Sequence, residues 1–517
     1  MPVVARIRVF AVVVAALMAA ACGASQEVRD EVAARNQALL AGAGGPASAA
    51  ATERGVPGAS GDAIDSLAPT PAEEGTEDAG AAGDGGSMAA SGPSRSANQA
   101  VQRSAPRATT ERVTGKPAAA TVSGTGATGP VLPGDPAGLA GPAAPGSEDN
   151  GGATDVGVTG DTIKIGGLFF NGSWLDKYSQ VAEQAASAYF RYVNDRGGIH
   201  GRKIQFVGCD TAGTVNGTQG CLRKLAEQDK VFSLGPSLDF NLDTAVPYVN
   251  GAKLPFVGSP GLYDAEFGSP YIFPTQYRGG EMGAIAATFM IQQQGAKRLG
   301  LSWNTQPPGP PCVDGVRRVA KALGAEIVVE ASNGPTESDL SPQVIRIRSA
   351  NPDAVIFCND PVNDVKFVQS AGRQNYRPPA GWIGAFCLAD DVPLAMGPAG
   401  VGFFCLTSYD PYFVETPGIA EMYRITRHYF PSHFHHAYTM PAFVGAKLLV
   451  EALQRTGPQL TRERLLATLR GVNAFDTRMG ITFDYSSRTP PKASGIVAQA
   501  DENLRWKSVT KRFAVAD

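Results

Sequence analysis

Asn194–Ile204 (NDRGGIHGRKI) marks a point where a helix gives way to a strand. Apolar residues within 178–193 recur at spacings of three and four, as on one face of a helix. Gly197 and Gly198 then permit the positive φ angles that end a helix. Residues 203–208 (KIQFVG) read as the strand that follows. The stretch therefore predicts a helix–turn–strand unit.

The same alternation continues along the chain on both sides of this unit. We predict strands at 161–168, 203–208, 231–234, 254–258, 298–303, 326–330, 353–357 and 381–386, and helices at 178–193, 280–294, 313–323, 340–349 and 361–372. Strands separated by helices indicate βαβ units and parallel sheets. Roughly 360 residues in such units exceed one comfortable core, so we expect an α/β fold of two Rossmann-like lobes. Ligands of open α/β sheets bind beyond the carboxyl ends of the strands.

The first part of the chain has a different composition. The protein has 517 residues, of which 18% are charged, and a formal net charge of −3, so it offers no strongly basic surface for nucleic acid. No Phe, Trp or Tyr stands between Phe10 and Phe169, and residues 41–150 are mostly Gly, Ala, Pro, Ser and Thr. Such a segment cannot bury enough apolar surface to offset a backbone entropy of ~1–2 kcal/mol per residue. We expect residues 23–155 to be a disordered tether and 156–517 to be the folded domain.

The N-terminus has the pattern of an export signal. Arg6 and Arg8 precede the apolar run Val9–Ala21, which is too short to span a bilayer but suits a secretory signal. The small residues before Cys22 resemble a bacterial lipobox, which implies that Cys22 is lipidated and anchors the protein to a membrane. We therefore expect residues 1–22 to be a lipoprotein signal peptide and the domain to lie outside the cytoplasm.

The junction at 194–204 resembles the N-D-x-G-G-I-x-G-x-x-(I/L) sequence of type I periplasmic binding proteins. The most similar group is the branched-chain amino acid (Leu/Ile/Val)-binding family of ABC importers. Other segments are similar to that family in the same order: 161–168 (DTIKIGGL), 230–237 (KVFSLGPS), 254–260 (LPFVGSP), 351–357 (NPDAVIF) and the late helix 438–455. The resemblance covers essentially residues 160–517.

The resemblance implies two lobes that close on a small solute. Three crossing segments would join the lobes, near 274–278, 408–413 and 480–486. Lobe one would comprise 160–275 and 411–482, and lobe two 276–410 and 484–517. The implied partners are the solute and the permease subunits of an ABC transporter, and we expect a monomer without a cofactor.

The resemblance also indicates candidate ligand-binding residues. In the family, hydroxyls and backbone groups of the third and fourth loops hold the polar groups of the ligand, and the matching positions are Ser237–Asn241 and Ser259–Tyr263. Tyr178 falls where the family often places an aromatic side chain over the ligand. The candidates from these loops and from the aromatic positions are Trp174, Tyr178, Ser237, Asp239, Ser259, Gly261, Tyr263 and Trp303.

One position departs from the family pattern. A carboxylate usually faces the ligand ammonium after the strand at 381–386, and this position reads Phe386 here. Asp360, Asp239 or Asp264 could replace it, although an aspartate in such a loop is more often a turn or helix cap. An aromatic cleft without the usual acid favours a larger, flatter or less cationic ligand than an α-amino acid.

The cysteines agree with export. Six remain besides Cys22, and an even number in an exported domain favours disulfides, with fifteen possible connectivities. Cys209 ends a strand and Cys221 lies in the next helix, so a bridge between them is geometrically easy. Cys387 and Cys405, which end successive strands, are a second candidate pair, and Cys312 with Cys358 is the remainder. No CxxC spacing indicates a zinc or redox site.

Neither a metal site nor an enzyme is indicated. Four of the five histidines lie at positions 428, 433, 435 and 436, but no Cys or spaced acid completes a ligand set, so we interpret 428–436 as a polar loop between helices. The sequence contains no GxSxG, HExxH or GxxxxGK[ST] motif. Ser259 in the GSPG sequence has no partnering His, which disfavours a hydrolase. The prediction is a solute-binding lipoprotein of an ABC importer. A ligand sensor that signals to a receptor is the alternative, because the same fold serves both.

Overall fold

The computed structural model describes residues 150–173, 175–434, 436–487 and 492–516. The predicted helix–turn–strand unit is present. Helix α3 (Asp176–Asp195) ends before Gly197 and Gly198, which have φ angles of 104° and 79°, and β2 (Lys203–Asp210) follows. A Cβ atom on Gly198 would lie 1.9 Å from the carbonyl oxygen of Arg202, so only glycine fits this turn.

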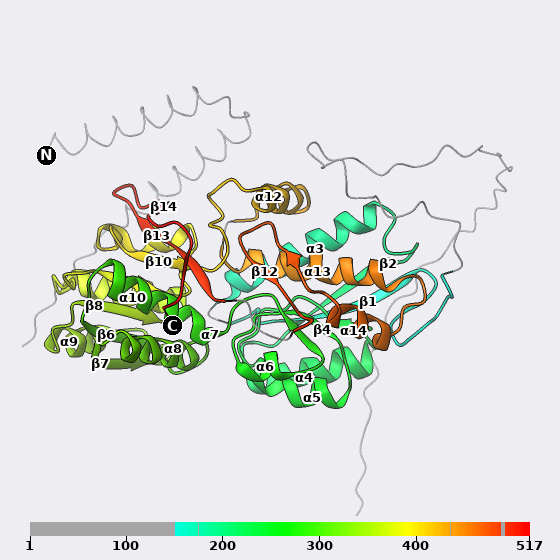
Figure 1. Cartoon of the computed structure of the whole chain (residues 1–517), viewed down its shortest axis with the longest axis horizontal. Helices are drawn as coiled ribbons and strands as arrows, with labels where there is room; N and C mark the ends of the chain where they lie inside the picture. Colours follow the sequence, from blue (N-terminus) through cyan, green and yellow to red (C-terminus); the bar gives the residue numbers. More distant parts are fainter. Residues whose placement is uncertain (1–149, 174, 435, 488–491, 517) are drawn as a thin grey trace, which may run out of the picture. The chain divides into compact units, whose positions relative to one another are not determined.

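Lobe one is built on a sheet of five parallel strands in the order β2-β1-β3-β4-β5. Helices α3 and α13 lie on one face of this sheet and α4 and α5 on the other (Figure 1). The C-terminal helices α12 and α13 pack on α3, and α14 packs on α13. The remaining elements are β1 (Thr162–Phe169), β3 (Ser233–Leu234), β4 (Phe256–Ser259), β5 (Ile272–Pro274), α4 (Val215–Arg223), α5 (Val246–Gly251), α6 (Asp264–Gly268), α12 (Pro417–Tyr429), α13 (Thr439–Thr456) and α14 (Arg462–Arg470).

Lobe two is built on a sheet of eight strands whose path is β14-β13-β10-β9-β8-β6-β7, with β15 paired to β13. Helices α7 and α8 pack together, as do α9 and α10. A π-helical turn at Phe289–Gln293 continues α7, so the two together match the helix predicted at 280–294. The elements are β6 (Arg298–Asn304), β7 (Glu326–Asn333), β8 (Ala354–Cys358), β9 (Trp382–Gly384), β10 (Phe404–Thr407), β13 (Ser494–Ala500), β14 (Trp506–Ser508), β15 (Phe513–Ala514), α7 (Gly279–Thr288), α8 (Gly309–Ala322), α9 (Ser341–Ser349), α10 (Pro361–Arg373) and α11 (Asp391–Met396).

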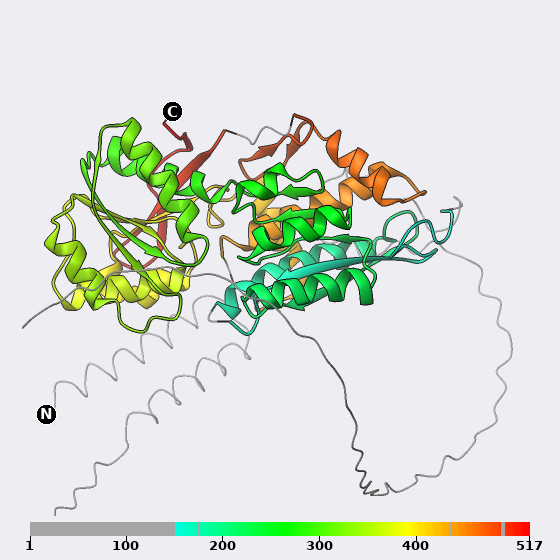
Figure 2. The ribbon, with the colours of Figure 1, turned by 90° about the horizontal axis from the view of Figure 1, so that it is seen from below.

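The predicted strands of lobe two are parallel, and three further strands that the sequence analysis did not predict are antiparallel. Strand β13 runs antiparallel to β10, and β14 and β15 are antiparallel to β13. Figure 2 shows this C-terminal ribbon, in red, running through lobe two. Antiparallel strands need no crossover helix, so the strand–helix alternation that revealed the other strands gives no signal here.

The chain passes between the two lobes in three places. The segment 275–278 joins β5 to α7, and 408–416 joins β10 to α12. The third passage follows the two-stranded ribbon of β11 (Phe475–Asp476) and β12 (Thr482–Phe483) and leads into β13. None of the described helices has the length and apolarity that a membrane-spanning helix requires.

Two arginines bind the first described residues to lobe one. The fully buried guanidinium of Arg202 donates to the carbonyl oxygens of Thr159 (2.7 Å), Gly152 (3.0 Å) and Pro458 (2.9 Å), and also to that of Asn150. Arg462 donates through its backbone amide to Asp155 (2.6 Å) and through its side chain to the carbonyl oxygens of Phe232 (2.9 Å) and Val231 (2.7 Å), which directly precede β3. We call these contacts the arginine clamp. They join a segment without secondary structure to the core of lobe one.

Candidate ligand cleft

The topology of each sheet defines where a ligand crevice forms. In lobe one the strand order reverses between β1 and β3, and in lobe two between β6 and β8. Crevices of open α/β sheets lie at such switch points, beyond the carboxyl ends of the strands. The loops after β1, β3, β6 and β8 therefore border the candidate cleft, and helix α10 begins in the last of them.

The first turn of α3 reaches lobe two. The ammonium of Lys177 forms an ion pair with Asp391 of α11, and the Tyr178 hydroxyl lies 3.4 Å from the Oδ2 atom of the same carboxylate. Beside them, Ala437 donates its amide hydrogen to the carbonyl oxygen of Leu388 (2.8 Å). These bonds hold the lobes together on one side of the cleft. Burial and the Asp391 charge raise the pKa of Tyr178, so its hydroxyl stays protonated.

An aromatic stack lies behind these contacts. The ring of His436 lies 4.4 Å from the ring of Tyr178 and 4.5 Å from that of Tyr438, measured between centroids. All three side chains are buried, and His436 is fully inaccessible. The interpretation of 428–436 as a polar loop is therefore wrong for His436. His433 is also buried and contacts Gln184 and Thr439, whereas His428 is exposed and His435 lies outside the described residues.

The loop after β3 is held by its own side chains. The Ser237 hydroxyl accepts a hydrogen bond from the amide of Leu168 at the end of β1 (3.0 Å). The buried Asp239 carboxylate accepts from the Thr218 hydroxyl (2.6 Å) and from the amide of Asn241 (3.0 Å). Burial raises the pKa of Asp239, and these donors oppose the shift. Both predicted residues lie at the cleft end of lobe one, and their polar atoms stabilise the loop.

The loop after β4 is organised by an acid that the sequence analysis missed. Glu266 is fully buried and accepts hydrogen bonds from the amides of Gly261 and Tyr263, each at 3.1 Å. Gly261 has a φ of 65°, and a Cβ there would lie 2.9 Å from the carbonyl oxygen of Gln276. Burial raises the pKa of Glu266 to about 7, although its hydrogen-bond donors, Ser259 first among them, lower it. The Tyr263 hydroxyl donates to the carbonyl oxygen of Phe240 (2.9 Å).

The aspartates considered as replacements for the missing acid are engaged elsewhere. Asp360 caps α10 by accepting from the amides of Val362 (2.9 Å) and Asn363 (3.0 Å). Asp264 is exposed and pairs with Arg278 at 3.1 Å. Asp364, one turn into α10, was not singled out from the sequence. It is fully buried beside Asn359, and neither of its carboxyl oxygens makes a hydrogen bond of acceptable geometry within the described residues.

Two aromatic candidates of lobe two lie near the same region. Trp303, in β6, is partly buried, and its indole N–H has no hydrogen-bond partner among the described residues. Phe386 is buried after β9, where it lines a small void with Tyr438 of lobe one and with Gln276 and Tyr409 of the crossing segments. Trp174 lies outside the described residues. Tyr438 thus belongs both to the stack with His436 and to the lining of the void beside Phe386.

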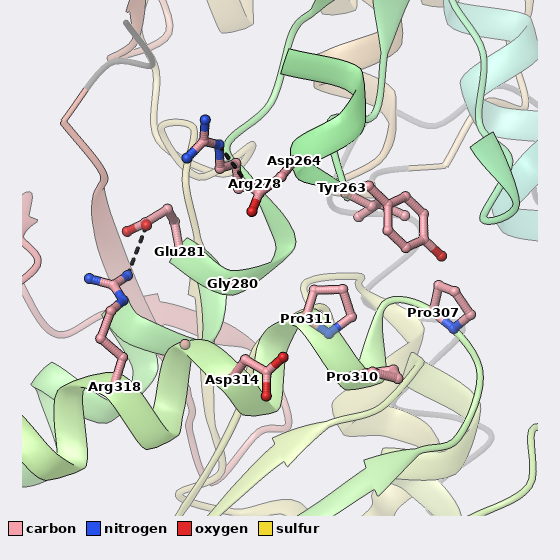
Figure 3. A pocket seen from close by; sticks show the side chains of 12 residues that line it. Tyr263, Asp264, Arg278, Gly280, Glu281, Pro307, Pro310, Pro311, Asp314 and Arg318 are labelled. Atoms are coloured by element: carbon pink, nitrogen blue, oxygen red, sulfur yellow. Dashed lines mark hydrogen bonds and ion pairs between the residues drawn. The ribbon is translucent and has the colours of Figure 1, made fainter. Parts of the chain in front are cut away.

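A groove of about 530 Å³ lies between the β4 loop and the start of α7 and α8. Its volume is in the range of small-molecule sites. Figure 3 shows Tyr263 facing Pro307 and Pro310, with the Arg278–Asp264 and Arg318–Glu281 ion pairs on the other side. The lining residues are Leu262, Tyr263, Asp264, Arg278, Gly280, Glu281, Pro307, Pro310, Pro311, Asp314, Gly315 and Arg318. The groove is thus shared by both lobes and by the first crossing segment.

All six described cysteines form disulfides. Cys209 pairs with Cys221 and Cys387 with Cys405, as predicted, and the remaining pair is Cys312 with Cys358. Cys209 lies near the carboxyl end of β2 and Cys358 ends β8, whereas Cys387 follows β9 and Cys405 lies near the start of β10. Cys22 lies outside the described residues. Within residues 150–516, apart from the undescribed gaps, no group of three or more His, Cys, Asp or Glu is arranged to hold a metal ion.

Comparisons with known proteins agree with this architecture. A family model described as periplasmic binding protein matches residues 162–504. The Leu/Ile/Val-binding protein homolog 7 of Brucella abortus is 23% identical over an alignment of 375 residues, which covers 67% of this chain and 89% of that protein.

Two solved structures show the same fold. A fatty acid ABC transporter substrate-binding protein from Thermomonospora curvata has a TM-score of 0.63 at 21% identity, with 71% of this chain and 96% of that chain covered. A branched-chain amino acid ABC transporter protein from Thermus thermophilus with bound valine has a TM-score of 0.62 at 20% identity, with coverages of 69% and 97%. The resemblance of the Asn194–Ile204 junction is confirmed, and the chain belongs to the periplasmic binding protein family.

Proposed function

We propose that this protein is an extracytoplasmic solute-binding lipoprotein of an ABC importer. It captures a small solute, an amino acid or a related amide or carboxylate, by closure of lobe one on lobe two. The chain itself carries out no reaction, and the ATPase of the importer supplies the energy of transport. The folded domain would deliver the solute to permease subunits as a monomer.

The observation that carries the proposal is the pairing of two switch-point crevices across the crossing segments. We infer that the loops at the carboxyl ends of both sheets border one cleft, because Tyr178 of lobe one contacts Asp391 of lobe two. A solute between the lobes favours the closed state only as far as it contacts both, so binding and closure are one equilibrium. Tyr178, Ser237, Ser259, Tyr263, Trp303 and Phe386 are the residues we propose to surround it.

The class of solute is inferred from the relatives. The Brucella protein is named for leucine, isoleucine and valine. Of the two solved structures, one is the substrate-binding protein of a fatty acid ABC transporter, and the other contains bound valine. These molecules share a carboxylate and an apolar chain. A partly apolar carboxylate or its amide therefore suits the aromatic cleft of this chain.

Membrane attachment is part of the proposal. We infer that residues 1–22 are removed as a signal peptide, that Cys22 is lipidated, and that 23–155 connect it to the domain. Flexible chains rich in Gly and Ser reach roughly 60–70 Å over this length, which would allow the domain to approach a permease.

The test is a thermal-shift screen of the purified protein. The panel contains aliphatic and aromatic amino acids, amides and urea, polyamines, and aliphatic and aromatic carboxylates. A free solute concentration one hundred times the Kd adds ~2.7 kcal/mol to the free energy of unfolding, and this increase raises Tm by several degrees. If the protein unfolds cooperatively and none of these solutes raises its Tm, the result would count against solute capture.

A matched pair of variants places the site. We expect Tyr178→Ala to weaken binding of the solute found in the screen at least about tenfold, because the substitution removes the buried ring at the contact between the lobes. Tyr248→Ala is the control, since Tyr248 lies on α5 and pairs with Glu227 (2.9 Å) at the surface of lobe one. Equal loss in both variants, or no loss in the first, would contradict the proposed cleft.

A further inference from the structure

Residues 388–391 (LADD) of lobe two reach across to lobe one, and we call them the latch segment. The amide of Ala437 donates to the carbonyl oxygen of Leu388 at 2.8 Å, and Ala389 forms an isolated β-bridge with His436. The carboxylate that ends the segment pairs with the first turn of α3. The latch segment therefore contacts lobe one beside the starts of both α3 and α13.

Lobe two holds the latch segment at two points. The indole N–H of Trp506, in β14, donates to the carbonyl oxygen of Ala389 at 2.7 Å, and both residues are buried. Directly before the segment, Cys387 forms a disulfide with Cys405 of β10. Residues 388–390 lie outside the named helices and strands of lobe two, so these two attachments set their position.

The indole is itself fixed by the sheet of lobe two. Trp506 is the register partner of Ala500 in β13, and β13 pairs in turn with β10. The disulfide also ends in β10. Both attachments of the latch segment therefore lead into the same adjacent strands, β10, β13 and β14, and their geometry does not depend on lobe one.

Separation of the lobes affects these contacts unequally. It breaks the hydrogen bond from Ala437 to Leu388, which joins the lobes, but it leaves the bond from Trp506 to Ala389, which lies within lobe two. A segment that already has its bound conformation loses less conformational freedom when the lobes meet. The bond from Trp506 thereby favours the closed state, and a solute that requires this state binds more tightly.

We propose that Trp506 is a positioning residue for solute capture. It holds the latch segment in the conformation that receives lobe one, and so sets the population of the closed state without touching the solute. The inference rests on the proposed function, because closure serves capture only where a solute binds between the lobes. It gives the antiparallel C-terminal strands, which the sequence analysis did not predict, a part in closure.

The first test is hydrogen exchange of the solute-free whole chain, because exchange of the Ala437 amide reports separation of the lobes. The Val392 amide donates to Ala389 within lobe two (3.3 Å). In the unmodified protein it should exchange at least about tenfold more slowly than the Ala437 amide, since separation of the lobes leaves its bond intact. Trp506→Phe retains a large ring and removes the donor, so Ala437 should exchange about two- to tenfold faster.

The second test measures affinity by isothermal titration with leucine, valine and decanoate. A solute that binds the unmodified protein should bind Trp506→Phe about two- to tenfold more weakly. Trp382→Phe is the matched control. The Trp382 indole is buried in β9 of the same sheet, and its N–H has no hydrogen-bond partner among the described residues. The control should lower Tm through lost packing but leave the affinity and the Ala437 exchange unchanged.

Coupling to the latch segment distinguishes positioning from a general loss of stability. Asp391→Asn changes the last residue of the segment and weakens its contact with α3. Because both substitutions act on one segment, Asp391→Asn should accelerate Ala437 exchange less in Trp506→Phe than in the unmodified protein. Effects that simply multiply would mean that Trp506 acts elsewhere.

The exchange measurements can overturn the inference without any solute. Equal Ala437 exchange in Trp506→Phe and the unmodified protein would do so, and so would an equal acceleration in Trp382→Phe. A Val392 amide that exchanges as fast as that of Ala437 would show that lobe two does not hold the latch segment. This comparison requires no variant, so it decides if Trp506→Phe does not unfold cooperatively. The proposed function fails separately, when the wider panel of solutes leaves Tm unchanged.

Discussion

Gly258 and Gly445 meet backbone to backbone, where α13 crosses the end of β4. A Cβ on Gly445 would lie 2.8 Å from the Cα atom of Gly258, and a Cβ on Gly258 would lie 2.9 Å from the Cα atom of Gly445. Such a contact leaves no room for a side chain on either partner. It seats the helix that follows Tyr438 directly against lobe one, and so fixes the position of the aromatic stack.

This contact predicts opposite effects for the same substitution in two helices. Gly445→Ala should destabilise the fold by about 1–3 kcal/mol through overpacking, despite the better helix propensity of alanine. Gly220→Ala, in α4, should stabilise it by up to about 1 kcal/mol, because a Cβ there has no atom within 4 Å. Urea denaturation of both variants measures the difference. Equal signs would contradict the close approach of α13 to β4.

The contact between Asp391 and the first turn of α3 predicts a change in closure. Asp391→Asn removes the ion pair with Lys177. The Asp391 side chain is 37% exposed and that of Lys177 54% exposed, so the pair stabilises the contact by at most about 1 kcal/mol. We expect solute affinity to fall by up to about fivefold and the solute-free protein to become less compact in small-angle scattering. Glu326→Gln removes an exposed pair with Arg298 inside lobe two and should change neither quantity. An affinity loss in the control alone would refute the prediction.

Glu266 predicts a dependence of stability on pH. Its pKa is raised from 4.5 to about 7, so between these values the folded protein binds more protons than the unfolded chain. Stability contributed by this group is therefore present below pH 4.5 and lost as pH rises through 7, by on the order of 3 kcal/mol.

Glu266→Gln should flatten that dependence between pH 5 and 7. Unfolding by urea at several pH values measures the slope in both proteins. Because the amide keeps only one acceptor oxygen for Gly261 and Tyr263, the variant loses about 1 kcal/mol at low pH. Glu227→Gln, whose carboxylate accepts from Tyr248 at the surface, is the control and should keep the slope of the unmodified protein. A slope unchanged in Glu266→Gln would place the titrating group elsewhere.

The proposed anchor is tested by fractionation of expressing bacterial cells. With Cys22 intact, two acyl chains on the protein give stable attachment to the membrane fraction. Cys22→Ser should move the protein to the soluble exported fraction, whereas Ser25→Ala should leave it with the membrane. Retention of the serine variant in the membrane would argue against lipidation at this residue.

Local rules predicted those parts of the fold that depend on neighbouring residues. The turn at Gly197 and Gly198 was predicted from a glycine pair after an amphipathic run. The disulfide between Cys209 and Cys221 was predicted from their short separation along the chain. Strands of the βαβ units were found for the same reason, since each is bounded by a helix. The antiparallel β13 was missed because pairing with β10 is set by the final packing of lobe two and leaves no local periodicity.

The candidate site was harder to predict from the sequence than the fold was. A histidine within His433–His436 reads as a surface residue, and only the packing of Tyr178 from a distant helix reveals that His436 is buried. Glu266 and Asp364 were missed for a similar reason, because a buried acid has no local sequence signal. The roles of Asp239 in its loop and of Asp360 as a helix cap, in contrast, depend on neighbouring residues and were anticipated.

The arginine clamp has a mechanical consequence. Arg202 and Arg462 fasten Asn150, Gly152 and Asp155 to lobe one, and these hydrogen bonds involve no described residue of lobe two. A load applied at Asn150 is therefore carried by lobe one alone and does not pull across the crossing segments. Tension from the proposed tether would act on lobe one alone and leave the angle between the two lobes unchanged.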